Sequence, residues 1–213
     1  KTTIASMFAS HGVHVLEADS IGRELMQPGQ PVYKVLLAHF SQYPDAPSMV
    51  LRDETIDRPT LAKYVFSTNR LDELNRIVHP AVVAEQERRI LVIFAKDPHA
   101  IAMVESALIF EADRARTTPD LRSRFDKLIL VTAPENIRLA RYIDRAGNGR
   151  ILSPEERSAL EEDGRRRIAM QMKDEEKIPF CDFVIENSGA VEEVAARVQK
   201  IFAELQALAA KHI

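Results

Sequence analysis

Short apolar runs alternate with longer segments of helical periodicity along most of the chain, and this alternation restricts the possible folds more than any other feature. The apolar runs predict strands at residues 13–16, 101–104, 127–131 and 183–185. Segments of helical spacing lie between them and are interrupted by glycine or proline. Strands joined by helices form parallel sheets with right-handed crossovers, so the sequence predicts an α/β fold.

Length, charge and cysteine content exclude several classes of protein. A chain of 213 residues has the size of one α/β domain with an inserted or appended subdomain. A net charge of −3 argues against a nucleic-acid binder. The single cysteine, Cys181, allows no intrachain disulfide and fits a cytoplasmic location. No apolar run approaches the ~20 residues that span a bilayer, and no signal peptide is visible, so no membrane partner is expected.

Residues 32–96 are predicted to form a mostly helical insertion. Pro28 and Pro31 interrupt the helical pattern that precedes it. Within the insertion, breaks between helices are expected at residues 57–59 (DRP) and at residues 79–80 (HP). A further amphipathic helix is expected from residue 191 to about residue 212.

The chain opens with Lys1-Thr2-Thr3 directly before a helical pattern of apolar residues. Lys-Thr at a helix start is what remains of a phosphate-binding loop, GxxxxGK(S/T), that is cut before its lysine. In such a loop the lysine reaches the β- and γ-phosphates and the next hydroxyl ligates Mg²⁺. Taken alone, two such common residues have no significance. We expect a strand and glycines to precede Lys1, and a protein that starts at Lys1 to fold poorly and to bind ATP weakly.

Two further features agree with a phosphate site. Glu17 and Asp19 follow the first predicted strand, where ligands bind in open α/β sheets, and Asp19 is a candidate proton acceptor. The alternative is that Asp19 only caps the next helix. Arginines recur on two helices joined by the turn at residues 147–149 (GNG), and a capping box is predicted at residues 153–156 (SPEE). This pattern indicates a lid that closes over phosphates, or else a solvated face rich in ion pairs.

Several stretches together resemble the dephospho-CoA kinase family. They are residues 17–29 (EADSIGRELMQPG), 56–66 (IDRPTLAKYVF), 74–80 (LNRIVHP), 104–111 (VESALIFE), 167–172 (RIAMQM) and 184–189 (VIENSG). The resemblance implies transfer of the γ-phosphate of ATP, with Mg²⁺, to the ribose 3′-hydroxyl of dephospho-CoA, the last step of coenzyme A synthesis. It also implies a P-loop kinase sheet flanked by helices. The implied domains are a kinase core at residues 1–27 and 97–213, a helical CoA-binding subdomain at 28–96 and a lid at 144–176.

The resemblance also implies roles for individual residues. Those expected at the nucleotide are Lys1, Thr2, Thr3, Arg141, Arg167, Asn187, Ser188 and Gly189, with Thr2 at the metal. Those expected at the acceptor are Asp19, Arg23, Arg58, His79 and Glu105. Lys1, Asp19, Arg141 and Arg167 are the expected catalytic residues, with Asp19 as the base.

The chain departs from the family pattern at four places besides its start. Glu17 stands where the family usually has Asp, and Glu105 and Ala107 stand where it often has Asp and Pro. Residues 148–163 make the lid longer than usual. His79 has a second interpretation, as a core histidine bonded to a carbonyl that the following proline frees.

Two other functions are compatible with these residues. One is a kinase of the same architecture for a nucleoside monophosphate or a sugar acid, although the apolar faces at residues 32–40 and 61–66 favour a groove for a pantetheine arm. The other is a non-catalytic nucleotide-binding module. A monomer or a weak homo-oligomer is expected.

Overall fold

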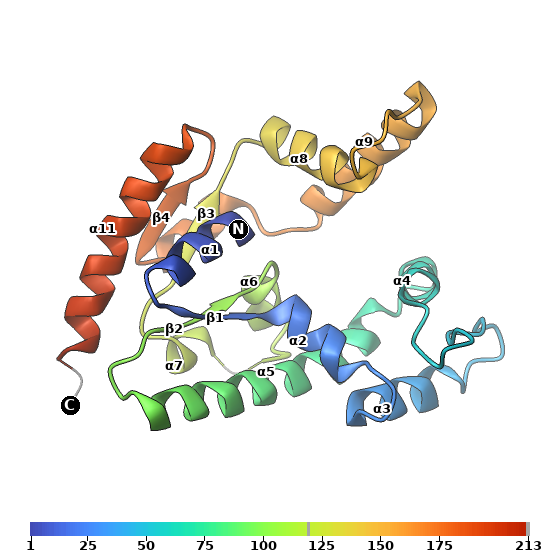
Figure 1. The fold of residues 1–213 in the computed structure, drawn as a ribbon. Coiled ribbons are helices and arrows are strands. Elements are labelled where there is room, and N and C mark those ends of the chain that lie inside the picture. The colour runs from blue at the N-terminus through green and yellow to red at the C-terminus, as the bar shows by residue number, and fades with distance from the viewer. Residues whose placement is uncertain (119, 212–213) are drawn as a thin grey trace. The chain divides into compact units, whose positions relative to one another are not determined.

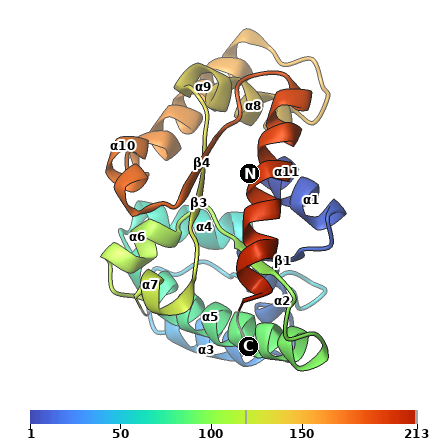
Figure 2. The same ribbon diagram turned by 90° about the vertical axis from the view of Figure 1, so that its left-hand side faces the viewer.

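In the computed structural model, which describes residues 1–118 and 120–211, the chain divides into two compact units. The terminal unit comprises Lys1–His11 and Leu121–Lys211, and the central unit extends from Gly12 to Asp120. Figures 1 and 2 show the helices and strands of both units. Parallel strands occur in each unit, as the alternating pattern predicts. The predicted division into core, CoA-binding subdomain and lid stays a prediction.

The central unit combines a pair of parallel strands with a group of helices. Its elements are β1 (His14–Glu17), α2 (Ala18–Leu25), α3 (Pro31–Phe40), α4 (Arg58–Ser67), α5 (Leu71–Lys96), β2 (Ala102–Glu105) and α6 (Ile109–Arg114). β1 pairs with β2 so that His14 lies opposite Ala102 and Glu17 lies opposite Glu105. The long helix α5 packs against α2, α3 and α4. These contacts place α2, which follows β1 directly, on a rigid support.

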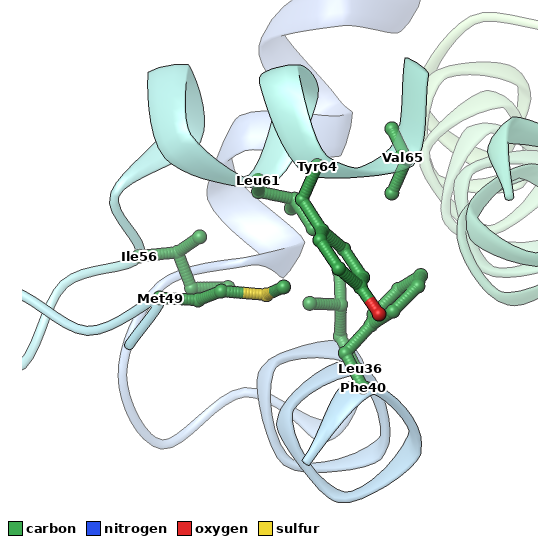
Figure 3. Packing of buried hydrophobic residues seen from close by; sticks show 7 residues of the cluster. All are labelled: Leu36, Phe40, Met49, Ile56, Leu61, Tyr64 and Val65. Carbon is green, nitrogen blue, oxygen red and sulfur yellow. The ribbon is translucent and has the colours of Figure 1, made fainter. Parts of the chain in front are cut away.

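Helices α3 and α4 and the loop between them enclose an apolar cluster. It consists of Leu36, Phe40, Met49, Ile56, Leu61, Tyr64 and Val65 (Figure 3). Val32, Leu36 and Phe40 recur at intervals of four residues, so they share the buried face of α3. The predicted break at residues 57–59 is confirmed, because α4 begins there and the Asp57 carboxylate accepts a hydrogen bond from the Thr60 N–H.

The predicted break at His79-Pro80 is wrong. Helix α5 continues through Pro80 from Leu71 to Lys96. A proline inside a helix removes one backbone hydrogen bond and crowds the preceding turn, but the bonds on either side remain. Packing of α5 against three other helices offsets this loss.

The terminal unit contains the second pair of parallel strands. Its elements are α1 (Thr2–Ser10), α7 (Leu121–Arg124), β3 (Ile129–Thr132), α8 (Glu135–Gly147), α9 (Pro154–Ala169), α10 (Asp174–Lys177), the 3₁₀-helix η1 (Ile178–Phe180), β4 (Phe183–Glu186) and α11 (Val191–Ala209). β3 and β4 are in register from Ile129 opposite Phe183 to Thr132 opposite Glu186. The predicted end of the last helix, near residue 212, lies outside the described residues.

Helix α1 packs on α11 within the terminal unit. Phe8 of α1 is fully buried, as is Val198 of α11. At the end of α1 the His11 ring stacks on Phe202, with the ring centroids 4.9 Å apart. These contacts fix the direction in which the first turn of α1 points within its unit.

Helices α8 and α9 form a hairpin, which Figure 1 shows beyond β3. The turn between them contains Asn148 and Gly149, both with positive φ. Ser153 and Glu156 form the predicted capping box at the start of α9. The helices come very close at Gly164, where an added Cβ would lie 2.6 Å from Leu139 and 2.9 Å from the Tyr142 ring. Only glycine fits this crossing.

No helix in the described part of the chain is both long and apolar enough to cross a membrane.

Candidate active site

The carboxyl ends of β1 and β2 carry acidic residues at one edge of the central unit. Each strand ends in a glutamate, and the register places Glu17 of β1 opposite Glu105 of β2. Asp19 lies two residues beyond β1, in the first turn of α2. Asp19 thus follows a strand, as predicted, and the structure places Glu105 at the same edge. This is the edge at which α/β proteins bind ligands.

The Asp19 side chain is exposed and does not cap α2. Helix α2 begins at Ala18 and its N-cap residue is Glu17, which makes no side-chain capping bond. Within the described residues, the Asp19 carboxylate forms no hydrogen bond or ion pair. The capping alternative is thus wrong, and the carboxylate is available to accept a proton from a ligand.

Helix α2 holds Asp19 in place through contacts with its neighbours. Arg23 Nε donates to the Asp19 carbonyl oxygen at 3.1 Å, so these two predicted site residues are adjacent. Glu24 pairs with Arg89 of α5 at 2.5 Å. Gly22 faces Val82 of α5, which allows the two helices to pack closely. The backbone beneath Asp19 is consequently well supported.

His79 lies on α5 and bonds a side chain rather than a helix carbonyl, which corrects the second interpretation of this residue. Its Nδ1 is 3.0 Å from Thr117 Oγ1. The Thr117 hydroxyl also lies 3.1 Å from the Ala112 carbonyl oxygen, and when it donates its one proton there it accepts from His79 Nδ1–H. Burial lowers the pKa of His79 and favours the neutral ring. In this arrangement neutral His79 carries its lone pair on Nε2.

Arg58 is the first residue of α4 and its side chain is exposed. The cap formed by Asp57 fixes the backbone at this position: Thr60 bonds to Asp57 through both its N–H and its hydroxyl, the latter at 2.7 Å. An exposed arginine on a fixed helix start is suited to bind an anion.

In the terminal unit, Lys1 is the N-cap residue of α1 and Thr2 and Thr3 begin the helix. All three side chains are exposed. The N–H groups in the first turn of a helix have no partner within that helix, and the helix dipole adds partial positive charge there. The start of α1 is therefore suited to hold phosphate oxygens.

Arg141 and Asn187 meet although they lie far apart in the sequence. Arg141 Nη1, on α8, donates to the Asn187 carbonyl oxygen at 2.9 Å. Asn187 follows β4, and its own N–H donates to the Thr132 carbonyl oxygen at the end of β3. Ser188 bonds back to Glu186 at 2.6 Å. Four residues predicted at the nucleotide thus belong to this unit's strand ends and to α8: Arg141, Asn187, Ser188 and the adjoining Gly189.

A side chain at Gly189 would displace the end of the Glu193 side chain. An added Cβ would lie 2.6 Å from Glu193 Oε2. Since the Glu193 side chain is flexible, this restriction is weaker than the one at Gly164.

Arg167, on α9, is held by Asp163 and stands beside Tyr142. Its Nε donates to Asp163 Oδ2 at 2.7 Å, and its guanidinium carbon lies 5.6 Å from the centre of the Tyr142 ring. Tyr142 OH donates to the same carboxylate oxygen. Asp163 was not predicted as a site residue, although its i,i+4 spacing to Arg167 is a pattern that could have indicated it. The role of Tyr142 depends on the packing of α8 on α9, which the sequence does not reveal.

The predicted site residues fall into two sets, one in each unit. The central unit holds Asp19, Arg23, Arg58, His79 and Glu105. The terminal unit holds Lys1, Thr2, Thr3, Arg141, Arg167, Asn187, Ser188 and Gly189.

Comparison with known proteins identifies the family. A family model described as dephospho-CoA kinase matches residues 1–193. The chain belongs to the dephospho-CoA kinase family. The resemblance found in the sequence is thereby confirmed, and with it the prediction of an enzyme: the chain is a kinase of coenzyme A synthesis.

Individual relatives agree with the dephospho-CoA kinase assignment. The dephospho-CoA kinase of Syntrophus aciditrophicus is 31% identical over 206 residues, which are 96% of this chain and 78% of the relative. That of Aquifex aeolicus is 32% identical over 206 residues, or 96% of this chain and 91% of the relative.

Solved structures confirm the predicted α/β kinase fold. TT1252 from Thermus thermophilus is 27% identical, with a TM-score of 0.68 and coverage of 96% of this chain and 91% of its own. The dephospho-CoA kinase from Campylobacter jejuni is 20% identical and has the same fold, with a TM-score of 0.63 and coverage of 97% and 91%.

Proposed function

We propose that this chain transfers the γ-phosphoryl group of ATP to the ribose 3′-hydroxyl of dephospho-CoA, with Asp19 as the base. The observation that carries this proposal is the exposed Asp19 carboxylate, which lies just beyond the carboxyl end of β1 with no partner of its own in the described residues. An unpartnered carboxylate on a well-supported helix can accept the proton of the attacking hydroxyl. The hydroxyl oxygen then bonds to the γ-phosphorus as the bond to the β-phosphate oxygen breaks.

Residues of the terminal unit would bind the nucleotide. The N–H groups at the start of α1 and the Lys1 ammonium are suited to the β- and γ-phosphates. Arg141 and Arg167 would stabilise charge on the transferred group, since positioned donors act most strongly where charge develops. Asn187, Ser188 and Gly189 would contact the adenine.

Mg²⁺ fits the oxygen donors at the start of α1. The Thr2 hydroxyl is exposed at the first position of the helix, and hydroxyl, water and phosphate oxygens are the ligands that Mg²⁺ prefers. When bound, the ion would neutralise charge on the β- and γ-phosphates. We assign Thr2 as the residue that holds it.

Residues of the central unit would hold the acceptor. Arg23 and Arg58 are exposed cations suited to its phosphate groups. His79 would accept a hydrogen bond at Nε2 from a donor on the acceptor, and Glu105 would lie beside the reacting hydroxyl. A cytoplasmic location belongs to the same proposal.

The test is a phosphotransfer assay of the full-length protein with ATP·Mg²⁺ and dephospho-CoA, with the product identified by mass. Asp19→Asn is expected to lower kcat roughly 10²-fold or more, with little change in ATP binding. Asp72→Asn is a matched control, because Asp72 is also an exposed aspartate at the second position of a helix. Transfer to a nucleoside monophosphate or a sugar acid, but not to dephospho-CoA, would contradict the proposal. ATP binding without any transfer would indicate a non-catalytic module.

A further inference from the structure

The Asp163 carboxylate binds three side chains at the crossing of α8 and α9. Arg167 Nε donates to Oδ2 at 2.7 Å, and Arg166 Nη2 donates to Oδ1 at 2.6 Å. Tyr142, on the opposite helix, donates to Oδ2 from its hydroxyl. Asp163 is one of the more enclosed acidic residues of α9, with its side chain 24% exposed, whereas the Arg167 side chain is 60% exposed. The carboxylate is thus fixed by the hairpin, while the arginine that it holds reaches into solvent.

The pKa values of these groups keep the arrangement intact around neutral pH. The hydrogen bond from Tyr142, supported by the two arginines, lowers the pKa of Asp163 well below its usual range. Burial, together with the bond to Asp163, raises the pKa of the Tyr142 phenol. Asp163 therefore stays ionised and Tyr142 stays protonated, so the donor and the acceptor remain matched.

The bond to Asp163 leaves most of the Arg167 guanidinium for another anion. A guanidinium has five N–H donors in a planar fork, and this bond uses the one on Nε. The edge formed by Nη1 and Nη2 is the edge that binds phosphate oxygens in pairs. Holding Nε fixes the plane in which that second edge lies.

Packing at Gly164 keeps the Tyr142 ring in place. Gly164, next to Asp163, is buried and leaves no space between α9 and the Tyr142 ring. The ring in turn lies beside the Arg167 guanidinium. The hydrogen bond that Arg167 donates to Asp163 and its contact with the Tyr142 ring therefore restrain the same side chain.

We propose that Asp163, supported by Tyr142, is a positioning residue that orients Arg167 toward the phosphates of bound ATP. This inference rests on the proposed function, in which Arg167 contacts the transferred phosphoryl group. An arginine that is already oriented loses less conformational freedom when it binds, and its donors need no rearrangement as charge develops. Asp163 acts through Arg167 and does not itself touch the substrate.

The experiment compares Asp163→Asn with Glu161→Gln in the full-length protein. Glu161 is a matched control, because it is a carboxylate on the same helix that pairs with Arg157 at 3.4 Å and with Arg165 at 3.9 Å. Each substitution is made in the wild type and in an Arg167→Ala background. The readouts are kcat, KM for each substrate, the dissociation constant of ATP·Mg²⁺ and the Tm.

In the wild type, Asp163→Asn should lower kcat roughly 10-fold or more, the size typical of losing a group that orients a ligating side chain. KM for dephospho-CoA should be unchanged. In the Arg167→Ala background the same substitution should have no further effect on kcat, because the arginine that it orients is gone. Glu161→Gln should change kcat less than about 2-fold in both backgrounds. Tyr142→Phe, which keeps the ring but loses the donor, should produce a smaller loss in the same direction.

Three results would overturn the proposal. An equal loss with and without Arg167 would mean that Asp163 only stabilises the hairpin. A rise in kcat would mean that Asp163 holds Arg167 away from the phosphates. If kcat is unchanged in Asp163→Asn, or in Arg167→Ala, the proposal is wrong. If the wild-type protein does not phosphorylate dephospho-CoA, the proposed function fails; the ATP·Mg²⁺ dissociation constants of the same variants then decide the positioning role separately.

Discussion

Arg141 Nη1 donates a hydrogen bond to the backbone carbonyl of Asn187 at 2.9 Å. This bond joins α8, which carries the phosphate-binding arginine of the proposal, to the turn after β4, where the adenine is expected. A ligand that displaces either partner changes the constraint on the other. The two ends of the nucleotide should consequently influence one another.

Arg141→Ala is therefore expected to weaken both phosphate and base recognition. We expect the dissociation constant of ATP to rise roughly 10-fold or more, the equivalent of losing one charge-assisted hydrogen bond. The affinity for adenosine, which has no phosphates, should also fall, because the turn loses its restraint. Arg145→Ala, one turn further along α8, should leave adenosine affinity as it is. Calorimetry with ATP and with adenosine checks both statements, and unchanged adenosine binding in Arg141→Ala would refute the coupling.

Arg167→Ala should lower kcat/KM roughly 10²-fold, the scale found when one donor to a developing charge is removed. Arg157→Ala should matter little, since Arg157 is an exposed residue paired with Glu161 on the same helix. Steady-state kinetics on both variants provide the comparison. Small and equal losses would mean that these arginines form only a solvated, ion-paired face.

The stability of the central unit should depend on pH through Glu73. Hydrogen bonds from His39 and Tyr43, followed by one from Arg70, lower the pKa of Glu73 from 4.5 to about 2. Because the folded-state pKa is the lower one, the stabilisation is fully present above the unfolded value and is lost as pH falls through the folded value. Glu73→Gln should thus lower the Tm at pH 6, and the difference from wild type should shrink between pH 4.5 and 2.

A pair of thermal-unfolding series over that range measures the difference. Glu87→Gln, at an exposed position on the same helix, is the control. Its Tm should change with pH in the same way as that of the wild type. If the Tm difference between the wild type and Glu73→Gln stays constant down to pH 2, Glu73 is not the titrating group.

The protonation of His79 can be read directly. Because Thr117 accepts from Nδ1, the ring nitrogens should give the ¹⁵N signature of the Nδ1–H tautomer at neutral pH. Thr117→Val removes that acceptor and should shift the ring toward the Nε2–H tautomer. If His79 Nε2 accepts a hydrogen bond from the acceptor substrate, the same variant should raise KM for dephospho-CoA more than it lowers kcat. An Nε2–H signature in the wild type would contradict the assignment.

Sequence periodicity predicted the four strands because each is determined by local pattern, whereas the short helices α6, α7 and α10 were not predicted. The strands at β1 and β3 lie within two residues of their predicted positions, and the capping box at Ser153 was found from its spacing alone. At Pro80 the local pattern was misleading. The local effect of the proline favours a break, but the tertiary packing of α5 outweighs it.

Only those residues of the candidate site that belong to sequence motifs could be predicted. Asp19 was identified by its place after a strand, but its freedom from a capping bond depends on where α2 begins. Thr117, which sets the tautomer of His79, is 38 residues away from it in the sequence. Such partners are brought together by the fold, and no spacing rule indicates them.

The register of β1 and β2 has an energetic consequence for this edge. It sets two carboxylates, Glu17 and Glu105, opposite one another on neighbouring strands, where like charges repel. We expect this repulsion to lower the stability of the protein at the place where it is proposed to react. Glu105→Gln should raise the Tm while it lowers turnover, which is the trade-off between stability and activity that is typical of active sites.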